Sequence, residues 1–267
     1  FIQEVNEMKK TLSALCALVL GAALCVGFVA CDEGSSGDEN GVLGQVSESQ
    51  WQTALSLDYE AESNFTLTQT LGSTYSQDEA ATYGEWSQRI NTYQMDNETN
   101  ILVHTYTSTV WVNDETVTED ETERVLAPHF ETETYTAYYF IEGGKYYCAA
   151  YTRYLGCEGR ESSESWRGGE ISLADYTELT ESVANLTAAF SMYSDPMMMQ
   201  AFSYNEETRS YEMMALGTVS MSLQFLENDG VRLVTYATSI TATTTTISDV
   251  NATEVSVPER ARTECGL

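Results

Sequence analysis

Basic residues are scarce in this chain of 267 residues. Twelve lysines and arginines stand against 41 aspartates and glutamates, which gives a formal net charge of −29. Residues 1–30 carry two lysines and two glutamates, which cancel, so the rest of the chain holds all of that charge. A negative field of this size disfavours nucleic acid and anionic lipid headgroups as partners. It is compatible with a solubilising exterior, with cations or with a basic protein partner.

Histidine is equally scarce, and the familiar catalytic motifs are missing. Only His104 and His129 are present, and they lie on separate segments. There is no Gly-x-Ser-x-Gly, no phosphate-binding glycine loop and no His-Glu-x-x-His. We expect His104 to be an ordinary residue of a strand face and His129 to lie in a loop. The sequence therefore predicts a protein that is not an enzyme, and a hydrolase with an unfamiliar site is only a third hypothesis.

Metal-binding patterns are also missing. No Cys-x₂-Cys or His-x₃-His spacing brings two zinc ligands together. The acidic run 114–123 lacks the alternating ligands and the glycine of a calcium loop. A solvated acidic loop is expected there, and the sequence predicts no metal and no cofactor.

Few cysteines follow Cys31, namely Cys148, Cys157 and Cys265. In an exported protein, Cys148 and Cys157 could form a short disulfide loop, which would leave Cys265 as an odd thiol. Two buried thiols at positions 148 and 157 are the alternative, because they would produce the same pattern.

The N-terminal segment has the layout of an export signal. Met8-Lys9-Lys10 places positive charge before an apolar run at 12–30, and an alanine precedes Cys31. A small residue directly before a cysteine resembles a bacterial lipoprotein signal peptide, whose cysteine becomes the lipidated first residue. Residues 1–7 precede a plausible initiator at Met8 and are interpreted as an over-long start.

An uncleaved anchor helix over 14–30 is the alternative to lipidation. Both interpretations hold the folded part at the extracytoplasmic face of a membrane. The predicted division is a signal peptide at 1–30, the lipidated cysteine with a flexible acidic tether at 31–44, and a single antiparallel-sheet domain at 45–267.

Strand patterns dominate the domain. Residues 65–71 alternate apolar and threonine side chains, as half-buried strands do. Gly143-Gly144 joins two tyrosine-rich runs, which indicates a hairpin. The most regular alternation precedes the turn Asn228-Asp229-Gly230, where every second side chain is apolar: Val219, Met221, Leu223 and Phe225. One apolar and one hydroxyl-rich face are typical of an antiparallel sheet with one face in water.

Two helices are predicted. Ser172 and Asp175 begin a segment with apolar residues at three- and four-residue spacing, which ends before Asp195-Pro196. Ser47 and Gln50 form a capping-box pair ahead of a shorter helix. The predicted fold is therefore α+β: a strongly curved antiparallel β-sheet, an incomplete barrel, with one main helix packed against it and a short N-terminal helix.

The order of these features resembles a known family. A lipoprotein signal and an acidic tether precede Phe65-Thr66-Leu67-Thr68, and the chain closes with Ile247-Ser248-Asp249-Val250-Asn251 and Val255-Ser256-Val257-Pro258. This layout resembles the lipoprotein-carrier family and the related lipid-transporting lipoproteins of mycobacteria. The resemblance implies an incomplete antiparallel barrel that wraps a helical plug and holds acyl chains in its hollow.

The leading hypothesis is a membrane-anchored, non-enzymatic lipoprotein that binds an apolar or amphipathic, lipid-like ligand in the hollow of the sheet. Burial of acyl chains would contribute roughly 0.8 kcal/mol per CH₂ group. The candidate wall comprises the apolar positions of one strand and two methionines of a soft cluster: Val219, Met221, Leu223, Phe225, Met197 and Met198. The alternative is a surface structural or protein-interaction module with a filled core and a basic protein partner.

Overall fold

The structure is a computed structural model that describes residues 41–267 except 57–63, Asp114, 120–121, 156–160, Asn228 and Ser239. The predicted signal peptide, Cys31 and most of the predicted tether lie outside the described residues. No helix within the described part combines the length and the apolarity that crossing a bilayer requires.

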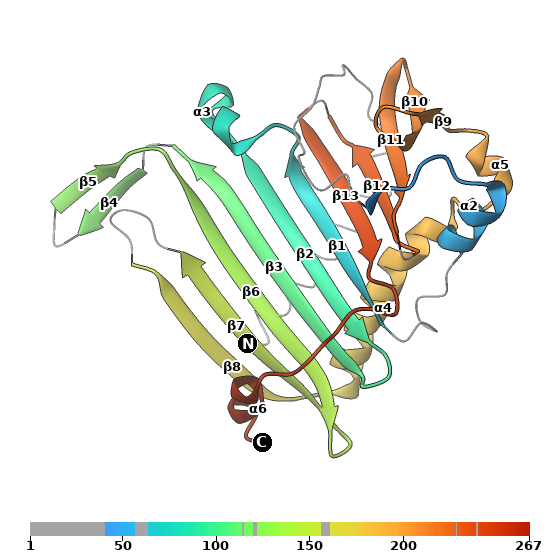
Figure 1. The fold of residues 1–267 in the computed structure, drawn as a ribbon. Coiled ribbons are helices and arrows are strands. Elements are labelled where there is room, and N and C mark those ends of the chain that lie inside the picture. Colours follow the sequence, from blue (N-terminus) through green and yellow to red (C-terminus); the bar gives the residue numbers. More distant parts are fainter. Residues whose placement is uncertain are drawn as a thin grey trace.

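Eleven antiparallel strands form one open sheet in the order β8-β7-β6-β3-β2-β1-β13-β12-β11-β10-β9 (Figure 1). Its strands are β1 Asn64–Ser73, β2 Ser87–Asp96, β3 Ile101–Val112, β6 His129–Glu142, β7 Lys145–Leu155, β8 Ser163–Ile171, β9 Ser203–Asn205, β10 Ser210–Ala215, β11 Thr218–Phe225, β12 Val231–Tyr236 and β13 Thr241–Ser248. A separate hairpin consists of β4 (Glu115–Glu119) and β5 (Thr122–Leu126). The predicted α+β class with one large antiparallel sheet is confirmed.

The helices are short except for one. They are α2 Glu48–Leu55, the 3₁₀ helix η3 Gln77–Glu79, α3 Ala80–Tyr83, α4 Leu173–Ser191, α5 Pro196–Met199 and α6 Glu259–Glu264. The predicted capping pair of Ser47 and Gln50 forms a complete capping box, and so do Ser172 and Asp175 at the predicted start of the longer helix. Each box satisfies backbone N–H groups that a helix start leaves without partners.

The sheet has two different faces, because successive side chains of a strand point to opposite sides. The inner face carries α2 and α4, and the ring of Tyr176 in α4 lies 5.2 Å from that of Tyr146 in β7. The outer face carries the C-terminal segment, where the hydroxyls of Thr66 and Thr253 are 2.8 Å apart. In Figure 1 this segment crosses in front of the sheet and α4 lies behind it.

The outer face is rich in hydroxyl groups, as the alternation predicts. Threonine side chains of β3 and β6 pair across the strands, with 3.3 Å between the hydroxyls of Thr105 and Thr136 and 3.1 Å between those of Thr109 and Thr132. The C-terminal helix α6 packs over β7 and β8 on the same face. These hydroxyl pairs contribute modestly to strand pairing.

The core fills the space between the inner face, α2 and α4. Trp51 of α2 is fully buried, and its ring lies 5.1 Å from Tyr211, 5.3 Å from Phe225 and 5.4 Å from Phe202. The indole N–H of Trp51 donates to the carbonyl of Tyr193 at 2.8 Å. The buried indole is therefore packed on several sides and keeps its one polar group satisfied.

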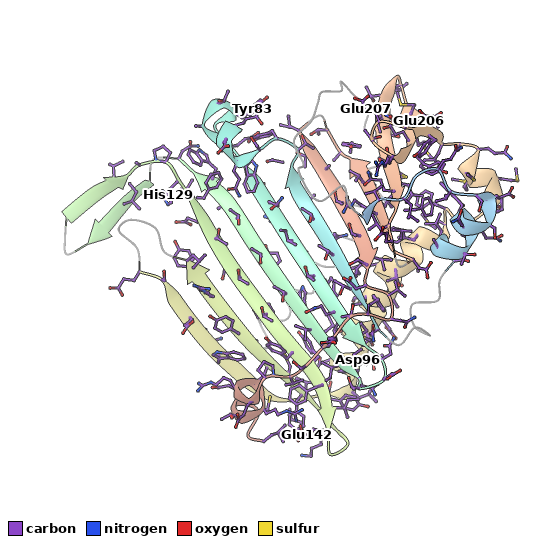
Figure 2. The ribbon with its side chains drawn as sticks, in the orientation of Figure 1. Tyr83, Asp96, His129, Glu142, Glu206 and Glu207 are labelled. Atoms are coloured by element: carbon purple, nitrogen blue, oxygen red, sulfur yellow. The ribbon has the colours of Figure 1, made fainter. Side chains whose placement is uncertain are left out.

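One edge of the sheet, here named the turn end, consists of tight connections. They include the β2–β3 turn at 97–100, the β6–β7 turn at 143–144 and the β11–β12 turn at 226–230. Gly143 and Gly144 have φ values of 58° and 78°, as a two-residue hairpin turn requires. Figure 2 labels Asp96 and Glu142 at this edge.

The opposite edge, here named the loop end, has connections of more varied length. They are the β1–β2 segment at 74–86, the β3–β6 segment at 113–128, the β10–β11 turn at 216–217 and the β12–β13 segment at 237–240. Figure 2 labels Tyr83 and His129 at this edge. The β4–β5 hairpin projects from the same edge in Figure 1.

Candidate functional site

The inner face changes character along its strands, and β3 shows the change most simply. From the turn end to the loop end, its inward positions are Leu102, His104, Tyr106, Ser108 and Val110. Leu102 is fully buried and His104 is 4% exposed, whereas the next three are half-buried. The inner face is thus a packed core near the turn end and an open polar surface toward the loop end.

The strand register extends this change into rows across the sheet. The apolar row, nearest the turn end, comprises Phe65, Met95, Leu102, Tyr139 and Cys148. Four residues nearer the loop end lies another row, which we name the polar row: Gln69, Asn91, Tyr106, Tyr135 and Thr152. His104 belongs to the row between them, at the boundary of the two environments.

His104 is held by its neighbours on β2. Its Nε2 lies 3.1 Å from Oδ1 of Asn91, and its ring stacks on Tyr93 at 4.4 Å between centroids with 5° between the planes. Tyr135 approaches edge-on, with its ring 6.4 Å away. Burial lowers the pKa of His104 to about 4, so the imidazole is neutral at pH 7.

One nitrogen of this buried ring has no partner. With Asn91 Oδ1 as the acceptor, Nε2 carries the proton and Nδ1 of His104 is left with a free lone pair. A buried acceptor without a hydrogen bond costs on the order of 1–3 kcal/mol. A hydroxyl or amide N–H placed against Nδ1 would recover that cost, which makes His104 the candidate ligand contact.

The sequence placed His104 correctly on a strand but gave no reason to single it out. The stacking partner Tyr93 lies 11 positions earlier in the chain and Tyr135 lies 31 positions later. Strand register brings them together, and register across long connections cannot be derived from one local pattern. A histidine directly after the apolar pair Leu102-Val103 was the one available signal.

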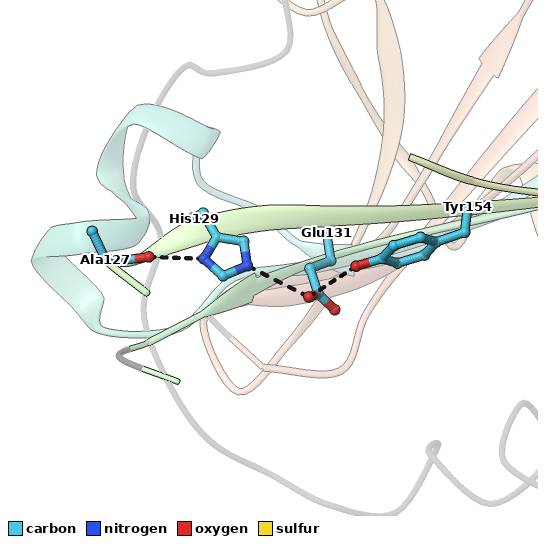
Figure 3. A network of polar contacts seen from close by, with 4 residues as sticks. All are labelled: Ala127, His129, Glu131 and Tyr154. Atoms are coloured by element: carbon cyan, nitrogen blue, oxygen red, sulfur yellow. Dashed lines mark hydrogen bonds and ion pairs between the residues drawn. The ribbon is translucent and has the colours of Figure 1, made fainter. Parts of the chain in front are cut away.

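His129 lies in a different network at the loop end (Figure 3). Its Nδ1 is 2.8 Å from the carbonyl of Ala127, and its Nε2 is 3.4 Å from Oε1 of Glu131. The hydroxyl of Tyr154 donates to the same carboxylate oxygen at 3.1 Å. Both ring nitrogens of His129 therefore face acceptors within the chain. The prediction that His129 lies in a loop is wrong by a small margin, since it is the first residue of β6.

Cys148 is buried on the inner face and forms no disulfide with another described residue. Burial raises its pKa to about 12, so it stays protonated and unreactive at neutral pH. Its predicted partner, Cys157, lies outside the described residues, and the disulfide stays a prediction. Cys265 lies on the outer face, with its Sγ 3.5 Å from the carbonyl of Cys148.

The strand positions predicted to line a hollow lie mostly in the core. Leu223 is fully buried and Phe225 is 3% exposed, with the Phe225 ring against Trp51. Met221 is partly buried against the same cluster, and Val219 is half-buried near the loop end of β11. These side chains share the inner face, as the alternation predicts, but Phe225 already packs against Trp51 of α2 and Leu223 is fully buried in the same core.

The two methionines predicted for the same wall lie on α5. Met197 is 76% exposed and Met198 is half-buried. The structure therefore does not gather all six predicted residues into one lining. A pocket of about 160 Å³ between α2 and the β11–β12 turn includes Phe225 and Leu226 in its walls. It is smaller than the roughly 300–1,000 Å³ of a typical ligand pocket, so it does not fit the predicted ligand.

Among the described residues, no group of three His, Cys, Asp or Glu side chains is placed to hold a metal ion. Comparison of the chain with protein-family models, with curated proteins and with solved structures finds no match. The resemblance to lipoprotein carriers therefore stays a prediction, and the function has to be argued from the inner face itself.

Proposed function

We propose that this protein is a membrane-anchored, extracytoplasmic, non-enzymatic lipoprotein that binds an amphipathic ligand on the inner face of its open sheet. The signal-like segment at 1–30 and lipidation of Cys31 supply the proposed anchor. The observation that carries the proposed binding is the unpartnered Nδ1 of His104 at the boundary between the apolar row and the polar row.

The ligand chemistry follows from what surrounds that nitrogen. Tyr93 and Tyr135 offer ring surface, and Asn91 and Gln69 offer amide groups in the adjacent polar row. A molecule with a hydroxyl or amide N–H beside an apolar portion would satisfy both environments. Each buried CH₂ group would add about 0.8 kcal/mol, and the hydrogen bond to His104 would fix the orientation.

The polar row is the better location for this ligand than the predicted wall on β11. Phe225 already packs on Trp51 and Leu223 is fully buried in the same core, so a ligand there would have to displace packed core side chains. Tyr106 and Tyr135 in the polar row remain half-buried. The proposed site therefore keeps the predicted face of the sheet and moves toward the loop end.

A protein-interaction module with a filled core is the second candidate. The dense packing around Trp51 and the net charge of −29 favour it, because an acidic surface suits a basic partner. Its binding would weaken with salt, whereas seating an amphipathic ligand on the inner face would not.

The test is to purify the full chain without detergent exchange and to identify co-purified small molecules by mass spectrometry. We expect an amphipathic molecule with the wild-type chain and about tenfold less with His104→Phe, which keeps a ring on Tyr93 but removes the acceptor. Thr105→Val, on the outer face of the same strand, is the matched control and should retain the ligand. A wild-type chain without any bound molecule, together with salt-sensitive capture of a basic protein, would support the second candidate instead.

A further inference from the structure

A large area of the outer face carries no charged side chain. It consists of three consecutive rows of outward positions on β13, β1, β2, β3 and β6, which begin on β1 with Thr68, Thr70 and Gly72. In Figure 1 this face is toward the viewer, and the C-terminal segment crosses it nearer the turn end. Eleven of these fifteen positions are half-buried threonines, and none of the other four is charged. We name the eleven the threonine field: Thr68, Thr70, Thr92, Thr105, Thr107, Thr109, Thr132, Thr134, Thr136, Thr244 and Thr246.

The charged residues of the same strand segments lie on the inner face. Along residues 131–134 of β6, glutamate and threonine alternate, and the register places Glu131 and Glu133 inward. Arg89 of β2 points inward as well. Strand propensity accounts for threonine in a sheet, but it does not account for the absence of charge from this face of a chain that carries −29. Depletion of charge on part of a surface is typical of the centre of a binding site.

The hydroxyls of the threonine field pair across strands and keep capacity for further hydrogen bonds. Three pairs join β3 to β6 at 3.1–3.4 Å, and Thr68 lies 3.5 Å from Thr92 between β1 and β2. Each pair has two O–H donors and uses one of them, so one donor and several lone pairs remain for a ligand. A ligand rich in hydroxyls satisfies such a surface, whereas an acyl chain would leave the hydroxyls without partners.

An aromatic cluster borders the threonine field on β6, β7 and β8. Thr136 is opposite Tyr151, and Tyr151 is opposite Trp166. The ring of Trp166 lies 4.9 Å from that of Tyr151 and stacks on that of Tyr138 at 6.2 Å, with 14° between the planes. All three rings are half-buried. One row therefore continues from Trp166 and Tyr151 into five threonines across seven strands, a length of roughly 29 Å.

The indole N–H of Trp166 differs from those of the other three tryptophans. Each of the other three donates a hydrogen bond within the chain, at 2.8–3.1 Å. The indole N–H of Trp166 has no acceptor among the described residues. Beside it, the hydroxyl of Tyr151 donates to Oε2 of Glu164 at 2.7 Å, and the remaining lone pairs of that carboxylate can accept from a ligand. The cluster thus combines ring faces with a free donor and a free acceptor.

The charge around the aromatic cluster is balanced. Together β7, β8 and α6 hold five basic and four acidic side chains, in contrast to the strong negative charge of the whole chain. Lys145 donates to Glu170 at 2.7 Å, and Arg153 is opposite Glu164 on the neighbouring strand. A cation would meet no local excess of negative charge, and an anion would be repelled by the field of the chain. The charge balance therefore favours a neutral ligand.

We propose that the outer face binds an extended neutral polysaccharide, with sugar rings packed on Trp166 and Tyr151 and further sugars hydrogen-bonded to the threonine field. The C–H groups of a sugar ring carry slight positive charge and pack on the negative faces of aromatic rings. The sugar hydroxyls are donors and acceptors that match those of threonine. No net charge has to be removed from water at this surface. The site lies on the opposite face from His104 and does not depend on the amphipathic ligand.

Binding to immobilised polysaccharides tests this proposal. The full chain, purified in a detergent without a sugar headgroup, is applied to neutral glucans, mannans and galactans and to polymers of uronic acids. We expect retention on at least one neutral polymer and none on the uronic acid polymers. Trp166→Ala should weaken that retention about tenfold. Thr105→Val, which keeps the shape of the side chain, should weaken it about threefold.

Two control variants remove similar groups from other places. Tyr83→Ala removes an exposed ring at the loop end, and Thr243→Val removes a hydroxyl from the inner face of β13. Both should retain the polysaccharide. Thermal unfolding shows which variants fold, and if Trp166→Ala does not, Thr105→Val against Thr243→Val decides. No retention on any neutral polymer, equal retention on uronic acid polymers, or equal retention by Thr105→Val and Thr243→Val would overturn the proposal.

Discussion

The two ends of the sheet differ in packing: the inner face is a packed core at the turn end and is open at the loop end. At the turn end, short turns bring apolar rows under α4, and fully buried side chains such as Leu102 and Leu67 form the core. At the loop end, longer connections leave the same face open, and Val110 on the same strand is only half-buried. The stability of the domain therefore comes from one end, and the surfaces available for binding lie toward the other.

The largest expected effect compares two inward side chains of β3. Leu102→Ala should lower the free energy of unfolding by about 3 kcal/mol, because it leaves a cavity in the packed apolar row. Val110→Ala, on the same face of the same strand near the loop end, should cost less than about 1 kcal/mol. Denaturant titration measures both. Equal losses would contradict the division of the inner face.

The pH dependence of stability tests whether His104 is buried and neutral at the boundary between the apolar row and the polar row. Its pKa is about 4 in the folded chain and about 6.5 when unfolded. Between these values the unfolded chain binds the extra proton, so stability falls as the pH falls from about 6.5 to about 4, by about 3 kcal/mol in full. The free energies of unfolding of the wild type and of His104→Gln, plotted against pH, should converge toward pH 4 and separate above pH 6.5. A constant difference across that range would mean that the ring is not buried neutral.

A glycine tests whether close strand packing persists at the loop end. A Cβ added at Gly72 would collide with the carbonyl oxygen of Ser87 and lie 2.8 Å from Cα of Gln88. Gly72→Ala should therefore destabilise the domain by about 2 kcal/mol. Gly169→Ala in β8 meets nothing within 4 Å and should change stability by less than about 0.5 kcal/mol. Thermal unfolding distinguishes the two, and an unaffected Gly72 variant would show that β1 and β2 are less tightly paired than described.

The smallest expected effect concerns the C-terminal helix at the turn end. Arg262 forms an ion pair with Glu142 and lies 5.5 Å over the ring of Phe140, but both charged side chains are about two-fifths exposed. Arg262→Ala should cost about 0.5–1 kcal/mol, and high salt should reduce the loss. Arg260→Ala, which removes only an exposed pair within α6, should cost less. A larger loss of stability for Arg260→Ala than for Arg262→Ala would mean that the contacts of Arg262 with Glu142 and Phe140 do not stabilise the turn end.

Much of the fold could be predicted because its signals are local. Alternation placed Phe65 and Leu67 on the buried side of β1, and Gly143-Gly144 marked a hairpin that the structure contains. The capping boxes at Ser47 and Ser172 located the starts of α2 and α4. The acidic run 114–123 was expected to be a loop, and this prediction is wrong, because β4 spans Glu115–Glu119 and β5 begins at Thr122. Helix α6 was not predicted. Charged and polar segments of five or six residues carry weak periodic patterns.

The candidate site was less predictable than the fold. The sequence placed Leu223 and Phe225 on the correct face, but only the assembled core, in which Phe225 packs on Trp51 of α2, decided that both are buried. His104 was expected to be an ordinary strand residue, and its unpartnered nitrogen depends on Asn91 and Tyr93 of the neighbouring strand. Whether a buried polar atom has a hydrogen-bond partner depends on the assembled sheet, so no local sequence pattern could reveal it.

The sequence by itself determined most of the elements: many strands by alternation, the longer helices by their caps and the tight turns by their glycines. Only the tertiary structure decided that β1 pairs with β13 from the far end of the chain and that His104 lies at a boundary. The reason is physical, since periodicity and capping act between residues a few positions apart, whereas register, burial and shared edges arise from contacts between distant segments.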